Sequence, residues 1–159
     1  MHRSVAVAVA IWLAVPSLLG GQQRVTIRPS TLALQVSELA GQPVKLPQAR
    51  VVGVLDPHVF VIETASRMRF AIGFRDRVVV LVHPGALRTP SSRLVGETVT
   101  VFGVARTLLG AQMTREVPWP DVLDQKVVDR LEIRAAVLAD SVQTAEGVEL
   151  TDNPATLRP

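Results

Sequence analysis

Arginine and phenylalanine are interleaved over residues 67–77, a composition suited to binding an anionic partner. The candidate binding residues are Arg67, Arg69, Phe70, Phe74, Arg75 and Arg77. On single-stranded nucleic acid, exposed aromatic rings stack on bases while cations follow the phosphates. The same cations can meet an anionic headgroup or the acidic face of a protein. A purely structural role stays open, because Phe60 and Phe70 also suit a core, and Glu63 and Asp76 dilute the positive charge.

Histidine and aspartate stand near predicted turns without forming a metal-site pattern. Asp56 lies two residues before His58, and His83 occurs later in the chain. A zinc site needs three or four converging nitrogen, oxygen or sulfur ligands. Beyond the first residues the chain has no third histidine, and it has no cysteine at all. We expect polar strand-end residues here, and we predict no metal and no other cofactor.

The sequence also offers no catalytic pattern. Ser91 and Ser92 lie in an arginine-containing loop without a glycine-flanked elbow, so we expect a solvated loop. Asp121 and Asp124 suit the first turn of a helix, where carboxylates oppose the helix dipole. No second carboxylate is placed to share acid and base work with them. We therefore predict that the protein is not an enzyme.

The N-terminus has the pattern of a secretory signal peptide over residues 1–21. His2 and Arg3 provide a positive start, Val5–Val15 is unbroken apolar sequence, and glycines 20 and 21 form the exit. That order is typical of a cleaved leader. The rival interpretation is a membrane anchor, since Ser4–Gln23 is uncharged and nearly long enough to span a bilayer. We predict export to the periplasm or cell envelope, with membrane contact only through an uncleaved leader.

Composition limits the kinds of protein that the chain beyond the leader can form. The 159-residue chain carries a formal charge of +3, which falls to about +2 when Arg3 is removed with the leader. An excess that small does not indicate nucleic-acid binding. The remaining chain is long enough for one domain with a single core. Without cysteine, disulfides, thiol catalysis and a lipid-anchored lipoprotein are excluded.

Hydrophobic patterning predicts a strand-rich domain over residues 36–149. A linker or short strand is expected before it at residues 22–35, and a flexible tail after it at residues 150–159. A single helical turn is expected near Ser37–Ala40, ended by glycine. A second helix is expected after Pro120, between the last two strands, with Leu123, Val127 and Leu131 on one stripe. Strands are expected at residues 44–55, with an edge or bulge position at Pro47, and at residues 58–64, 67–74, 77–82, 96–106 and 133–142.

One strand motif carries a family resemblance. Residues 94–106 contain a hydrophobic residue, then Gly96, alternating valines, Gly103 and Val104; residues 37–44, 49–63 and 135–142 flank this motif in order. The arrangement resembles exported, periplasmic bacterial OB-fold proteins, a largely uncharacterised group, over about residues 36–144. The resemblance implies an all-β fold: a small five-stranded OB-like barrel behind a signal-peptide helix. The helix expected between the last two strands departs from the usual OB position, between the third and fourth.

The expected function is that of a binding or structural module, not a catalyst. We predict an exported, non-enzymatic, OB-like module of the cell envelope that interacts with a protein or an anionic envelope partner. The alternative is a domain that binds single-stranded nucleic acid or another oligoanion through the Arg/Phe face at residues 67–77. Export makes the nucleic-acid alternative the less favoured one.

Overall fold

The computed structural model describes residues 23–65, 76–108 and 132–152. Within them lie β1 (Val25–Thr26), α1 (Pro29–Leu39), β2 (Pro43–Asp56), β3 (Val59–Thr64), β4 (Val78–Val82), the 3₁₀ helix η2 (Ser91–Leu94), β5 (Thr98–Thr107) and β6 (Ala135–Thr144). Five predicted strands are confirmed, with boundaries that differ from the prediction by no more than two residues: those at residues 44–55, 58–64, 77–82, 96–106 and 133–142. The strand predicted at residues 67–74 lies outside the described residues. No helix in the described ranges is long and apolar enough to cross a membrane.

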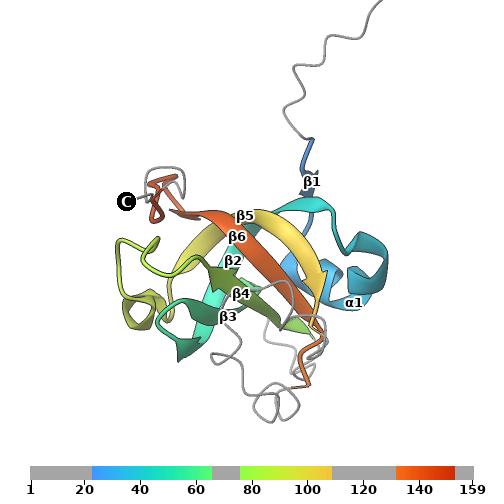
Figure 1. Cartoon of the computed structure of the whole chain (residues 1–159), viewed down its shortest axis with the longest axis horizontal. Coiled ribbons are helices and arrows are strands. Elements are labelled where there is room, and N and C mark those ends of the chain that lie inside the picture. The colour runs from blue at the N-terminus through green and yellow to red at the C-terminus, as the bar shows by residue number, and fades with distance from the viewer. Residues whose placement is uncertain (1–22, 66–75, 109–131, 153–159) are drawn as a thin grey trace, which may run out of the picture.

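Five strands close into a barrel, and β1 lies outside it (Figure 1). The order around the barrel is β2-β3-β4-β6-β5, and β2 closes it by pairing with β5 as well as β3. Within the barrel, neighbouring strands are antiparallel except β4 and β6, which are parallel. Aliphatic side chains and Phe60 fill the interior. The five-stranded, OB-like barrel predicted from the sequence is confirmed.

The long strand β2 closes the barrel because it bends. Its first part pairs with β5 and its second part with β3. The ladder to β5 is interrupted between Leu46 and Ala49, at Pro47 and Gln48, and Gln48 has a positive φ of 51°. Proline cannot donate a ladder hydrogen bond, so a bulge is where a strand tolerates it. The bulge predicted at Pro47 is therefore confirmed, and it turns β2 from one sheet neighbour to the other.

The two glycines of the recognisable strand motif have separate structural causes. Gly96 sits in the turn before β5 with a φ of 90°, in the left-handed region that favours glycine. Gly103 lies on β5 opposite Ala139 of β6, at an irregularity in the ladder between the two strands. A Cβ atom there would fall against the carbonyl oxygen of Leu138 and only 2.7 Å from Cγ1 of Val137. The motif is thus required by barrel geometry, without reference to a ligand.

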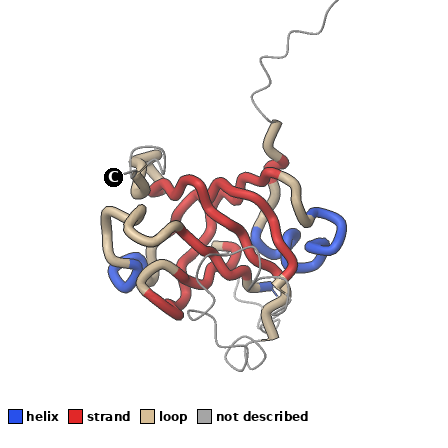
Figure 2. Tube along the Cα trace, in the orientation of Figure 1, coloured by secondary structure: helices blue, strands red, loops and turns tan. Residues whose placement is uncertain are grey.

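Helix α1 closes one end of the barrel, at the right in Figures 1 and 2. Leu32 and Val36 are buried in the barrel core, while Leu34 is 72% exposed. The turn that follows the helix is fixed to β5 by the hydrogen bond from the Gly41 N–H to the carbonyl of Ala105. At the start of the helix, the hydroxyl of Thr64 on β3 accepts a hydrogen bond from the backbone N–H of Ser30.

This helix corrects two expectations. The sequence predicts a linker or short strand over residues 22–35; a short strand is present at Val25–Thr26, but the helix begins at Pro29 and is longer than the predicted single turn. In the described residues the α-helix precedes the barrel strands instead of lying between the last two. The helix predicted after Pro120 lies outside the described residues. Proline fits at the first helical position because no intrahelical N–H bond is lost there.

The opposite end of the barrel is closed by the loop between β4 and β5 together with the C-terminal segment, at the left in Figure 1. The backbone N–H of Leu150 donates to Val142 on β6, and that of Arg88 donates to the carbonyl of Leu150. Thr151 is buried, with 3% of its surface exposed. Residues 150–152, expected to be part of a loose tail, are therefore bonded on both sides; residues 153–159 lie outside the described residues.

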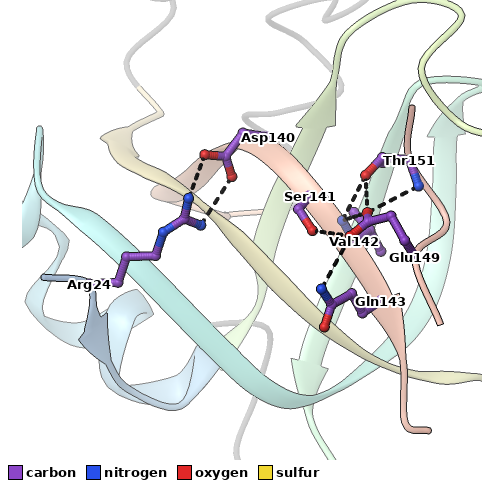
Figure 3. A network of polar contacts seen from close by, with 7 residues as sticks. All are labelled: Arg24, Asp140, Ser141, Val142, Gln143, Glu149 and Thr151. Atoms are coloured by element: carbon purple, nitrogen blue, oxygen red, sulfur yellow. Dashed lines mark hydrogen bonds and ion pairs between the residues drawn. The ribbon is translucent and has the colours of Figure 1, made fainter. Parts of the chain in front are cut away.

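Glu149 holds this C-terminal segment to β6 (Figure 3). Its carboxylate accepts hydrogen bonds from the hydroxyl of Ser141 at 2.7 Å, the side-chain amide of Gln143 at 3.2 Å, and both the hydroxyl and the N–H of Thr151. Burial alone would raise the pKa of Glu149. The hydrogen bonds to the ionised form outweigh burial, and the pKa is lowered from its usual value of 4.5.

A lowered pKa makes the contribution of Glu149 depend on pH. Stability from a carboxylate with a depressed folded-state pKa is present above its unfolded pKa and is lost as pH falls through the folded value. We expect Glu149→Gln to lower the free energy of unfolding at pH 7 by about 1 kcal/mol, a figure kept small because the carboxylate is partly solvated. The difference from wild type should shrink as both proteins are unfolded in urea at pH values falling from 5 to about 3.

Glu38→Gln is the matched control, since the Glu38 side chain is exposed and its carboxylate makes no hydrogen bond in the described part of the chain. A loss in Glu149→Gln that is the same at every pH would contradict the prediction.

Candidate functional site

Of the six predicted binding residues, Arg77 alone lies in the described ranges; Arg67, Arg69, Phe70, Phe74 and Arg75 lie outside them. Arg77 directly precedes β4, and its Nε is 3.8 Å from a carboxylate oxygen of Glu63 on β3. Arg50 on β2 stands opposite Glu63 in the ladder. The positive charge at this edge of the barrel is therefore shared with a carboxylate.

The outer face of β3, β4 and β6 is aliphatic and buried. Its residues are Val59, Val61, Val79, Leu81, Leu108, Ile133 and Ala136. Phe60, which stands beside them on β3, points into the barrel and is fully buried. In OB barrels the second and third strands, here β3 and β4, commonly provide the ligand face. Within the described residues this face carries no aromatic ring for stacking bases.

A different outer face carries an aromatic ring between cations. Phe102 on β5 is partly exposed. The guanidinium of Arg24 lies 5.3 Å from its ring centroid, and Nζ of Lys45 lies 5.4 Å from it. Cations within about 6 Å of a ring face are attracted by its quadrupole. We call Arg24, Lys45 and Phe102 the basic-aromatic surface.

Strand pairing assembles this surface from distant parts of the chain. Lys45 and Phe102 are directly opposite in the β2–β5 ladder. Arg24 immediately precedes β1, which pairs with β2 in parallel, Val25 opposite Val44. The alternating valines of residues 96–106 already place Phe102 on the opposite side of the strand, and the buried interior positions of β5 confirm that it faces outward. The alternation within β5 does not predict which residues of other strands lie beside Phe102. The sequence alone therefore did not indicate that Lys45 and Arg24 contact the ring.

The surface has a positive bias. Lys45 forms no ion pair with the carboxylates of the described residues, whereas Arg24 is paired with Asp140 on β6 at 2.9 Å. Within the described residues, the two cations held at Phe102 thus outnumber the one carboxylate that pairs with them, Asp140. An anion approaching Phe102 therefore meets net positive charge.

The predicted turn residues take structural roles. The carboxylate of Asp56 accepts a hydrogen bond from the N–H of His58 at 3.2 Å, which shapes the turn between β2 and β3. No group of three metal-ligating side chains gathers anywhere in the described ranges. Ser91 corrects the expectation of a solvated loop, because it is buried and its hydroxyl donates to the carbonyl of Asp56 at 3.2 Å. The open groove beside it, about 330 Å³ in volume, is lined by residues 54–57 and 90–92 and is mainly apolar.

The chain has little likeness to known proteins. No protein-family model and no curated protein matches it. Among solved structures it is similar to an aspartyl tRNA synthetase from Entamoeba histolytica, with a TM-score of 0.36 and 10% sequence identity. The match covers 91% of this chain and 29% of the synthetase chain. A likeness at that score supports no functional argument, so the fold assignment rests on the strand pairing.

Proposed function

We propose that this protein is an exported, non-enzymatic binding module of the cell envelope, built on an OB-like barrel, whose partner presents anionic groups to the basic-aromatic surface. The single observation that carries the proposal is Phe102 on the outer barrel wall with Arg24 and Lys45 both held at its ring. Export is inferred from the leader pattern of residues 1–21, which precedes Arg24 by three residues.

The arrangement suits recognition of charge more than catalysis. The ring orders two long, flexible cations whose placement would otherwise cost side-chain entropy. Pre-ordered cations bind an anionic partner better, because that entropy is not lost again on binding. General acid and base catalysis needs a proton donor and a proton acceptor placed within reach of a bound substrate. Arg24 and Lys45 instead lie at a ring on the outer barrel wall.

Single-stranded nucleic acid is less well supported as the partner. The outer face of β3 and β4 offers aliphatic side chains where base stacking would need aromatic rings. The Arg/Phe segment predicted for that role lies, apart from Arg77, outside the described residues. A single-stranded oligonucleotide is therefore included as one of the ligands in the binding test.

The double substitution Arg24→Gln with Lys45→Gln tests the proposal. Protein expressed from the full chain is mixed with phosphatidylglycerol–phosphatidylethanolamine vesicles, with phosphatidylcholine vesicles, and with a single-stranded oligonucleotide. We expect wild type to bind the anionic vesicles most tightly, and the double variant to bind them about tenfold or more weakly, at about 1 kcal/mol per cation near an anionic surface. Binding should also weaken as added salt screens the charges.

The matched control is Arg88→Gln with Arg93→Gln, which removes the same charge from the segment between β4 and β5. Equal losses in the two double variants would mean that overall charge, and not this surface, governs binding. Tighter binding of the oligonucleotide than of the vesicles would replace the proposed partner with nucleic acid.

A further inference from the structure

The basic-aromatic surface already contacts one carboxylate, from within the protein. Arg24 donates two hydrogen bonds to Asp140, at 3.2 Å to Oδ1 and 2.9 Å to Oδ2, although the two residues are 116 positions apart (Figure 3). This is the paired-donor geometry with which a guanidinium binds carboxylate or phosphate. Asp140 therefore contacts Arg24 in the way that an anionic group of a bound ligand would.

The contact is also open to exchange. The side chains of Arg24 and Asp140 are 36% and 50% exposed, so solvent and solutes reach both. Exposed ion pairs are weak, because water solvates the separated charges well. The guanidinium of Arg24 has a second anchor, the ring of Phe102, which keeps it in place when Asp140 turns toward solvent.

We propose that Asp140 occupies, in the free protein, the position that a phosphate group of the ligand takes in the complex. The ligand displaces the carboxylate from Arg24, and Lys45 supplies the second positive charge. This inference rests on the proposed function, and it adds the chemical class of the ligand: a phosphate or phosphate ester, either in a lipid headgroup or in a soluble polyanion. Two cations at one ring favour a group of higher charge than a lone carboxylate.

The exchange predicts that removing the internal carboxylate strengthens binding. Asp140→Asn keeps the size of the side chain and removes the competing charge. Binding is measured for phosphatidylglycerol vesicles and, separately, for soluble inorganic polyphosphate, again with protein from the full chain. We expect Asp140→Asn to bind more tightly than wild type, by up to about fivefold, the range of an exposed ion pair. The probe that shows the larger gain identifies the source of the phosphate.

Asp152→Asn is the matched control. Asp152 pairs with Arg88 at 2.6 Å at the other end of the barrel, with similar exposure, so its substitution makes the same change in charge. Equal gains in the two variants would reduce the effect to net charge and overturn the inference. Unchanged or weaker binding by Asp140→Asn would also overturn the inference. Asp140 would then either have no effect on ligand binding or help to position Arg24. Those outcomes would not contradict the proposed function. The proposed function fails separately, if wild type binds neither probe.

Discussion

Replacing Gly103 with alanine is expected to lower the free energy of unfolding by about 3 kcal/mol or more. The added Cβ would fall against the carbonyl oxygen of Leu138, 2.7 Å from Cγ1 of Val137 and 2.8 Å from Cα of Ala139. Backbone atoms cannot move aside as the end of a long side chain can. The strands β5 and β6 would have to separate, with loss of ladder hydrogen bonds on both sides of the site. Urea unfolding followed by circular dichroism measures the change.

Gly53→Ala is the control for this substitution. Gly53 also lies in a barrel strand, but a Cβ there meets no atom within 4 Å. We expect its free energy of unfolding to stay the same or rise by up to about 1 kcal/mol, since alanine restricts the unfolded chain more than glycine does. Comparable losses at both glycines would show that strand propensity, and not the close approach of β5 and β6, explains the motif.

Replacing Leu32 with alanine is expected to lower the free energy of unfolding by about 3 kcal/mol. Leu32 is fully buried where α1 meets the barrel core. Shortening it leaves a cavity at the closed end, since the helix and five strands cannot all move inward to fill it. Thermal and urea unfolding of the variant give the size of the loss.

Leu34→Ala separates burial from helix propensity. The two leucines are two residues apart on α1, but Leu34 is 72% exposed. We expect its substitution to change the free energy of unfolding by less than about 0.5 kcal/mol. If Leu32→Ala were as mild as Leu34→Ala, the helix would not be an integral part of the barrel.

The sequence predicted the barrel strands well because a strand with one buried face alternates. Val99, Val101, Gly103 and Ala105 are buried on β5, and the residues that alternate with them are partly exposed. The helix α1 was predicted less well. The sequence predicted a linker or short strand over residues 22–35 and only one helical turn near Ser37–Ala40. In the structure, Leu32 and Val36 form a buried stripe at helical spacing, with Leu39 partly buried beside them. Local alternation could not show that Leu34 would be left in solvent.

The candidate site was harder to predict, because its parts meet only through strand pairing. That Phe102 faces outward is evident from the pattern of β5 alone. That Lys45 stands opposite Phe102 depends on the bulge at Pro47, which shifts the register of β2 against β5. That Arg24 reaches the ring depends on the parallel pairing of β1 with β2. Composition therefore favours a contiguous arginine-rich segment and carries no signal for a surface built from three separate parts of the chain.

The position of α1 in the chain has a consequence for the order of folding. The helix is synthesised before every barrel strand, yet the core that buries Leu32 and Val36 includes residues as far along as Val137 and Val142. An isolated helix of 11 residues is marginal in water, because helix nucleation is unfavourable. We therefore expect α1 to leave the ribosome ahead of the barrel and yet to be among the last elements to become stable, once β6 has completed the barrel wall.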